Sequence, residues 1–287
     1  MRLLWLTDLH LEFTEAGDSS RESLELRILS AEFDAAVVTG DISNAKGLKT
    51  HLPWLAKVIG KPTYFVLGNH DFYHGSFSSV EALVSSICAS GAANNLIHLG
   101  QGEIVPLTKR SALIGYAGWG DGLAGAGIRS TVRLNDFGYI ADLRSLEKPA
   151  LFEKLAARGQ AYADYIRRVL PLALEAYDHV WIATHVPPFE EAAWHAGRRT
   201  EPDHLPHFSN LAAGNAIREI AADYPNKRIN VICGHTHSSG AAYIAPSILA
   251  LTRGAAYYKP EIAAIFDIQA EEERPPSAWL QSWPEQP

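Results

Sequence analysis

Five short apolar segments that each end in a cluster of polar residues constrain this sequence most strongly. The segments are residues 3–6, 35–38, 63–67, 180–183 and 229–233, and the clusters that follow begin at Thr7, Thr39, Gly68, Thr184 and Gly234. Continuous apolar runs of this length are typical of buried strands. We therefore expect a core of buried strands, each of which carries polar side chains at its carboxyl end.

Helical patterns lie between these strands. The spacings Ser19-x-x-Glu22 and Ser78-x-x-Glu81 fit capping boxes and predict helices over 24–33 and 80–89. Further helices are expected over 51–59, over 151–177 with an interruption at Pro171, and over 210–222, with a hairpin over 102–117. Alternating strands and helices indicate an α/β layered fold, in which ligands bind beyond the carboxyl ends of the strands.

Two long segments lack regular periodicity. Residues 118–138 are rich in glycine, and residues 186–208 are rich in proline and histidine. The first contains Gly120-x-Gly122-x-x-Gly125, a dinucleotide-binding spacing, but residues 128–133 do not open an apolar-periodic helix, so we interpret it as a loop. We expect both loops near the mouth of the site, where the arginine pairs Arg129/Arg133 and Arg198/Arg199 are candidates for gripping an anion.

The charge balance excludes some partners. The chain has 25 Lys and Arg against 32 Asp and Glu, a net charge of −7, so it has no global attraction for nucleic acid or for an anionic membrane. No run of 18 apolar residues predicts a membrane span. Cys88 and Cys233 lie in apolar runs and predict buried thiols, and no signal peptide precedes the first strand. These features favour a cytoplasmic location.

The polar clusters together supply carboxylate, imidazole and amide side chains: Asp8, His10, Asp41, Asn69, His70, Asp71, His185, His235 and His237. Such a mixture suits Mn, Fe or Zn, and the lack of thiolate ligands argues against a structural zinc site. The i, i+2 pairs at 8/10 and 235/237 would each place two side chains on one face of a strand end. The set is too large for one tetrahedral ion and matches two ions that share a carboxylate. With a bridging hydroxide the centre would carry a net charge of about +1, which would attract a phosphate ester anion.

In order, the motifs are Asp8-x-His10, Gly40-Asp41, Gly68-Asn69-His70-Asp71, His185 and Gly234-His235-x-His237. With them, residues 3–237 resemble the calcineurin-like metallophosphoesterase superfamily. The resemblance implies an α/β fold, a four-layer α/β/β/α sandwich of two mixed sheets flanked by helices. Residues 1–268 would form a single domain, followed by a proline-rich tail over 269–287.

The resemblance also implies the roles of the site residues. One metal would be held by Asp8, His10 and His237, the other by Asn69, His185 and His235, and Asp41 would bridge them. A metal-bridging hydroxide would attack phosphorus in line. His70, oriented by Asp71, would contact the phosphate and protonate the leaving oxygen. Histidine suits that role because its pKa lies close to neutral pH.

Departures from the superfamily narrow the substrate. Residues 42–44, after Asp41, lack the Asp-Arg pair of the protein Ser/Thr phosphatases, and His70 stands where the lipid-precursor pyrophosphatases usually carry arginine. We therefore expect a small phosphodiester, phosphoanhydride or phosphomonoester as substrate. The alternatives are a nuclease, which would need a basic groove, and a catalytically silent scaffold of the same fold that binds metal.

Other residues are candidates for subsidiary roles. His74 lies close to the Asn-His-Asp motif, and His195, His204 and His207 lie in the second long loop; each could line the site, although ordinary loop surface is the simpler interpretation. Trp279 and Trp283 in the tail could pack on the domain or form a contact between subunits of a homo-oligomer.

Overall fold

The computed structural model describes residues 1–15 and 17–274 and contains two large mixed sheets. In the first sheet the strand order is β13 (Ile262–Asp267), β1 (Arg2–Leu6), β2 (Ala35–Thr39), β3 (Thr63–Val66) and β4 (Leu96–His98). Strands β1 to β4 run parallel, and β13 is antiparallel to β1. The carboxyl ends of β1, β2 and β3 therefore meet at one edge.

The second sheet has the order β11 (Gly240–Ala245), β12 (Ile248–Thr252), β10 (Arg228–Cys233), β7 (His179–Ala183), β6 (Ser111–Gly115) and β5 (Val105–Pro106). Its four inner strands are parallel, and β11 and β5 are antiparallel edge strands. The pairing of β5 with β6 confirms the expected hairpin. A separate small ribbon pairs β8 (Trp194–His195) with β9 (Arg198–Arg199).

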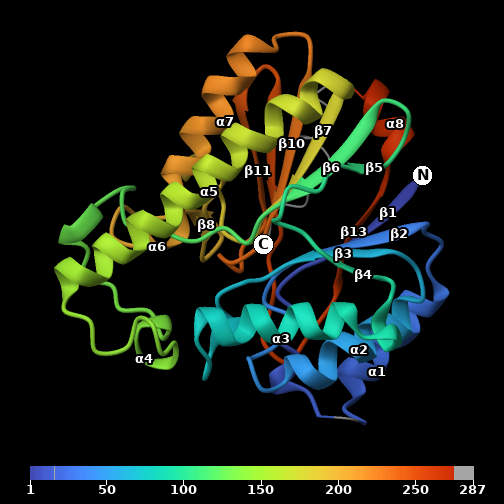
Figure 1. The fold of residues 1–287 in the computed structure, drawn as a ribbon, viewed down its shortest axis with the longest axis horizontal. Coiled ribbons are helices and arrows are strands. Elements are labelled where there is room, and N and C mark those ends of the chain that lie inside the picture. The colour runs from blue at the N-terminus through green and yellow to red at the C-terminus, as the bar shows by residue number, and fades with distance from the viewer. Residues whose placement is uncertain (16, 275–287) are drawn as a thin grey trace.

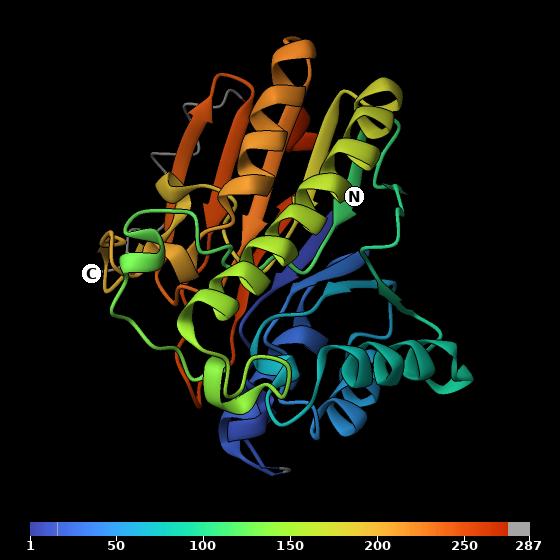
Figure 2. The same cartoon turned by 60° about the vertical axis from the view of Figure 1, so that its left-hand side comes forward.

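Helices cover the outer faces of both sheets (Figures 1 and 2). The first sheet is covered by α1 (Ser19–Ser30), α2 (Leu48–Ile59) and α3 (Phe77–Ala89), and the second by α5 (Lys148–Ala176) and α7 (Leu211–Asp223). The short helices are α4 (Asp136–Tyr139), α6 (Leu205–Phe208) and α8 (Ile268–Glu273), together with the 3₁₀ turns η1 (Leu11–Phe13), η2 (His70–Phe72), η3 (Gly91–Ala93), η4 (Gly127–Arg129) and η5 (Glu190–Ala192). The architecture is the expected α/β/β/α sandwich.

Strand β1 shows why the strands are apolar throughout. Successive side chains of a strand point to opposite faces. Leu3 and Trp5 lie in the core between the sheets, and Leu4 and Leu6 lie in the core beneath α1 to α3. Both faces are buried, so the sequence shows a continuous apolar run instead of an alternating one.

Three helix details differ from expectation. Asp18, not Ser19, caps α1, and the capping box of α3 joins Ser76 to Ser79 instead of Ser78 to Glu81. Helix α5 continues through Pro171 without interruption. Proline removes one backbone donor there, but Leu170, Ala173 and Leu174 are fully buried in the core shared with α7 and the second sheet, and this packing holds the helix together.

Within the described residues, no helix is both long and apolar enough to span a bilayer. The tryptophans Trp279 and Trp283, for which we expected a packing or subunit contact, lie outside the part of the chain that the structure describes.

His179, at the start of β7, predicts a loss of stability in acid. Burial, aided by the nearby positive charges of Arg228 and Arg110 and opposed by Glu272, lowers its pKa to about 4. The unfolded chain therefore binds the proton more tightly, so His179 costs no stability above pH 6.5 and an increasing amount as the pH falls toward 4. For this group we expect a loss of about 2 kcal/mol between pH 7.5 and 5.

Urea unfolding at both pH values, monitored by tryptophan fluorescence, measures the free energy of unfolding. His179→Phe should lose about 2 kcal/mol less than the parent chain between the two pH values, because its ring cannot be protonated. Equal losses in the two proteins would show that His179 does not contribute.

Candidate metal centre

The seven expected metal ligands lie together at the carboxyl edge of both sheets. Asp8 and His10 follow β1, Asp41 follows β2, Asn69 follows β3, His185 follows β7, and His235 and His237 follow β10. Residues more than 200 positions apart thus meet, as shown by the 3.0 Å between the Nε2 atoms of His10 and His237.

The backbone at this edge turns sharply. Five of the seven residues have positive φ: Asp8 (48°), His10 (45°), Asp41 (50°), His235 (69°) and His237 (56°). The i, i+2 pairs therefore converge through left-handed turns and not, as expected, because an extended strand end places them on one face. Non-glycine residues adopt this conformation at a cost, and clusters of them mark functional sites.

Two glycines of the motifs allow the close approach of these turns. A Cβ at Gly68 would overlap the Asp41 carboxylate, and a Cβ at Gly234 would overlap the carboxylate of Asp8. The glycines of the two motifs are therefore steric requirements of the carboxylate positions.

A first cluster consists of Asp8, His10, Asp41 and His237, whose ligand atoms all lie within 4.8 Å of one another. His237 Nε2 is 3.5 Å from Asp8 Oδ1, and His10 Nε2 is 3.7 Å from Asp41 Oδ2. Burial opposes ionisation of Asp8, but the His237 hydrogen bond and the charge of His185 outweigh it and lower the pKa of Asp8 to about 2.

A second cluster is centred on the side-chain oxygen of Asn69. Asn69 Oδ1 lies 3.0 Å from His185 Nε2 and 2.9 Å from His235 Nδ1. Asp41 Oδ1 lies 3.4 Å from the same nitrogen of His185. Asp41 thus turns one carboxylate oxygen toward each cluster.

Hydrogen bonds behind the second cluster orient its members. His185 Nδ1 is 2.8 Å from the carbonyl of Thr39, and His235 Nε2 is 3.1 Å from that of His207. Each ring can donate to a carbonyl only from that nitrogen, so the neutral ring presents a lone pair to the cluster. Asn69 Nδ2 donates to Asp136 Oδ1 at 2.9 Å, which directs the amide oxygen of Asn69 inward.

These donors fit a pair of cations. The inward atoms of the seven residues can offer lone pairs when the rings are neutral, and both aspartates are ionised, because the pKa of Asp41 also lies well below its usual range; burial opposes this, but the positive charges of His185 and His70 prevail. Burial lowers the pKa of His185, but the charge of Asp41 outweighs it and raises that pKa to about 10, so a bound cation would take the place of the proton on this ring. Burial lowers the pKa of His235 to about 3, which keeps that ring neutral, as a metal ligand must be. Buried carboxylates and imidazoles that face one another need such a counter-charge.

His70 lies beside the first cluster and outside both. Its Nδ1 is 3.0 Å from Glu12 Oε1, and its ring stacks on Tyr73 at a centroid distance of 4.1 Å. Burial lowers the pKa of His70, but the charges of Asp41 and Glu12 outweigh it and raise the pKa to about 8. The ring can therefore carry a proton at neutral pH.

Asp71 does not orient His70, contrary to expectation. Its carboxylate turns back into the protein and accepts hydrogen bonds from the backbone N–H groups of Ile42, Ser43 and Gly68 at 2.8–3.0 Å. The η2 turn directs adjacent side chains in different directions. Asp71 thus ties the loops after β2 and β3 together, and Glu12 takes the place beside His70.

The sequence reasoning missed three residues at the site. Glu12 continues the alternation of Asp8 and His10 and could have been found by that spacing. Asp136 and Tyr257 carry no local signal. Asp136 supports Asn69 and accepts from the Tyr73 hydroxyl at 2.7 Å, and the Tyr257 ring lies 4.7 Å from that of His10.

Both long loops border the second cluster. Residues Gly120, Leu134, Val186 and His207 line a small cavity with Asn69 and His235. His207 meets His235 through its carbonyl, whereas the His195 ring stacks on His204 and the His74 ring lies against Tyr139. None of these four histidine side chains is among the residues grouped as metal donors in the described chain.

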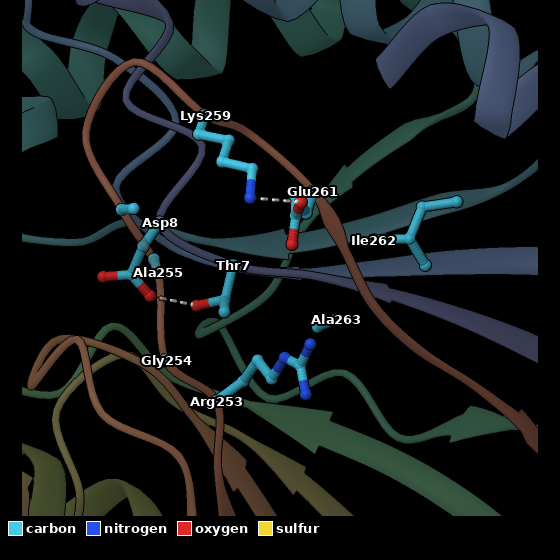
Figure 3. A pocket seen from close by; sticks show the side chains of 10 residues that line it. Thr7, Asp8, Arg253, Gly254, Ala255, Lys259, Glu261, Ile262 and Ala263 are labelled. Carbon is cyan, nitrogen blue, oxygen red and sulfur yellow. Dashed lines mark hydrogen bonds and ion pairs between the residues drawn. The ribbon is translucent and has the colours of Figure 1, made fainter. Parts of the chain in front are cut away.

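A second cavity, of about 150 Å³, adjoins Asp8. Thr7 and Asp8 line it together with the segment that follows β12, from which Arg253 and Lys259 extend into the same space (Figure 3). Lys259 pairs with Glu261 at 3.4 Å. Of the loop arginines proposed from sequence, Arg198 pairs with Glu201 and Arg199 covers the Trp194 ring.

Comparison with known proteins agrees with this fold. Residues 1–239 match the family model of calcineurin-like phosphoesterases. The structure resembles phosphopantetheinyl hydrolase from Mycobacterium tuberculosis at a TM-score of 0.59 and 12% identity, over 91% of this chain and 94% of that one. It also resembles a dimetal phosphatase from Danio rerio at a TM-score of 0.54 and 13% identity, over 92% of this chain and 91% of the other. No curated protein matches by sequence.

Proposed function

Because this chain belongs to the calcineurin-like phosphoesterase family, we propose that it hydrolyses a small phosphodiester, phosphoanhydride or phosphomonoester with the help of two metal ions. The position of Asp41 carries the proposal: one carboxylate oxygen faces His10 and the other faces His185, as a group shared by two ions would. Mn, Fe or Zn suits the donors.

The first cluster would hold one ion through Asp8, His10 and His237, and the second would hold another through Asn69, His185 and His235, with Asp41 between them. Such a pair of ions, when bound, activates water and neutralises charge on the phosphoryl group. The protein's part is to hold the donors in place: the carbonyls of Thr39 and His207 fix two rings, and Asp136 fixes the amide of Asn69.

His70 would donate the proton that the leaving oxygen needs. It stands at the edge of the first cluster, with its ring 4.4 Å from that of His10. Glu12 contacts Nδ1, so Nε2 is left to face a substrate. Glu12 is thus the positioning residue of this proton donor.

The long loops favour a small substrate. Residues from 118–138 and 186–208 close around Asn69 and His235, which favours a small substrate over a protein or a nucleic acid duplex at the second cluster. We propose one catalytic domain with both loops at the mouth of its site. The domain extends past the expected boundary at residue 268 through α8, because Arg228 donates hydrogen bonds to the carbonyls of Glu271 and Glu272.

Asp136→Asn should weaken metal binding without unfolding the chain. The asparagine can keep its contact with Tyr73 but loses the charge that holds the amide of Asn69, and changes behind a ligand typically cost 10- to 100-fold in metal affinity. Isothermal titration calorimetry with the metal measures the change in affinity. Asp142→Asn, which alters a carboxylate bound to the backbone of Phe77, is the control and should leave affinity unchanged.

The test of the function is a hydrolysis screen on protein reconstituted with Mn, Fe, Zn or Ni. The substrates are diesters such as bis(4-nitrophenyl) phosphate, monoesters, cyclic nucleotides, nucleoside polyphosphates, and single-stranded and duplex nucleic acid. We expect metal-dependent turnover of at least one class. Stoichiometric metal without turnover of any would contradict the proposal and favour the silent scaffold, and preference for long nucleic acid would favour the nuclease.

A further inference from the structure

We propose that Phe13, Tyr257 and Tyr258 form a stacking platform that binds a nucleobase of the substrate, so that the phosphoester hydrolysed is that of a nucleotide. We call these three residues the aromatic platform. The inference rests on the proposed phosphoesterase function and specifies its substrate class.

The three side chains of the aromatic platform are exposed and lie together. The relative exposure is 37% for Phe13, 45% for Tyr257 and 65% for Tyr258. The Phe13 ring lies 5.2 Å from Tyr257 and 5.3 Å from Tyr258, with interplanar angles of 77° and 48°. Grouped aromatic rings that remain in contact with water mark a binding surface, whereas single exposed apolar residues do not.

The aromatic platform adjoins the candidate metal centre directly. The Tyr257 ring lies 4.7 Å from His10 and 4.9 Å from His237, and the Phe13 ring lies 6.5 Å from His70. Phe13 is held there by η1, which begins immediately after His10. One small molecule could therefore place a flat group on these rings and its phosphate at the first cluster.

The turn that carries the two tyrosines is strained. Lys259 N–H donates to the carbonyl of Ala256 at 3.1 Å and closes a four-residue turn with Tyr257 and Tyr258 at its centre. Tyr258 has φ of 65°, at a position where such turns favour glycine. A bulky side chain in this conformation costs free energy and points to a functional reason for keeping the ring.

The chemistry of the aromatic platform favours a nucleobase over an alkyl chain. Planar rings stack on aromatic side chains regardless of base identity, and each stacked base contributes substantially to affinity. Tyrosine also offers hydroxyl groups to the polar edges of a base. An alkyl chain would gain equally from leucine, which is the basis of the test.

The first experiment compares binding of two phosphonates whose C–P bond cannot be hydrolysed: 9-(2-phosphonomethoxyethyl)adenine and the same phosphonate without adenine. Calorimetry on the metal-loaded protein should show about tenfold tighter binding of the adenine compound. Equal affinities would overturn the aromatic platform even if phosphoester hydrolysis is observed. Absence of both binding and hydrolysis would overturn the proposed function as well.

The second experiment uses variants. Phe13→Leu keeps the apolar volume but removes the ring, and Tyr258→Gly removes the ring while relieving the turn. Both should lose most of the preference for adenine, and the Tm of Tyr258→Gly should be no lower than that of the parent chain. In hydrolysis of AMP against ribose 5-phosphate, KM should rise for AMP alone. Leu172→Ala, at an exposed apolar residue on α5, is the control. Preference retained in both variants would refute the proposal.

Discussion

Asp41→Asn is expected to lower kcat/KM by about 10³-fold, equivalent to ~4 kcal/mol of transition-state stabilisation. Asp41 Oδ2 faces His10 at 3.7 Å, and Asp41 Oδ1 faces His185 at 3.4 Å and accepts from the backbone N–H of His70 at 2.8 Å. Asparagine removes the charge between the clusters and must turn an NH₂ group toward one of them. Two cations would then lack their shared anion.

The measurement combines kcat/KM with metal content by mass spectrometry. We expect the variant to bind less than two equivalents of metal. Asp164→Asn, at an exposed carboxylate on α5, is the matched control and should behave as the parent chain. Full activity with two bound metals in Asp41→Asn would remove Asp41 from the shared position.

His70→Asn is expected to lower kcat by 10²- to 10⁴-fold, the usual contribution of a positioned general acid. Metal content should stay at the parent value, because His70 lies outside both clusters. The loss should be largest for alkyl esters and smallest for 4-nitrophenyl esters, since 4-nitrophenolate leaves without a proton.

This dependence on the leaving group separates proton donation from a structural effect. His74→Asn is the control: its ring lies against Tyr139 and touches neither cluster, so turnover should be unchanged. An equal loss with both esters in His70→Asn would contradict the role of His70 as acid. Unchanged turnover would remove it from the mechanism.

The expected strand ends and the observed ones agree because burial on both faces leaves a clear signal. Residues 3–6 and 35–38 read as strands from composition alone and form β1 and β2. The predicted starts of α1 and α3 differ from the observed ones. Asp18 and Ser76 compete with neighbouring serines as caps, and local hydrogen bonding in the folded chain selects between them.

Some features of the site could likewise be predicted from the sequence, and others could not. Each candidate ligand could be predicted because a polar residue at the end of a buried strand is conspicuous. Asp71 was misjudged because neighbours in sequence need not be neighbours in space: its carboxylate binds backbone N–H groups, and Glu12, 58 positions from His70, takes the place beside that ring.

By itself, the sequence determined the class of fold, the edge at which polar groups gather and the donor atoms available to a metal, since these follow from hydrophobic pattern and side-chain chemistry. Only the tertiary structure decided which donors face each other, that the two oxygens of Asp41 face His10 and His185, that Asp136 supports Asn69, and that Tyr257 covers His10. Those contacts join segments tens to hundreds of residues apart, and their geometry is set by how the two sheets pack, which no local pattern encodes.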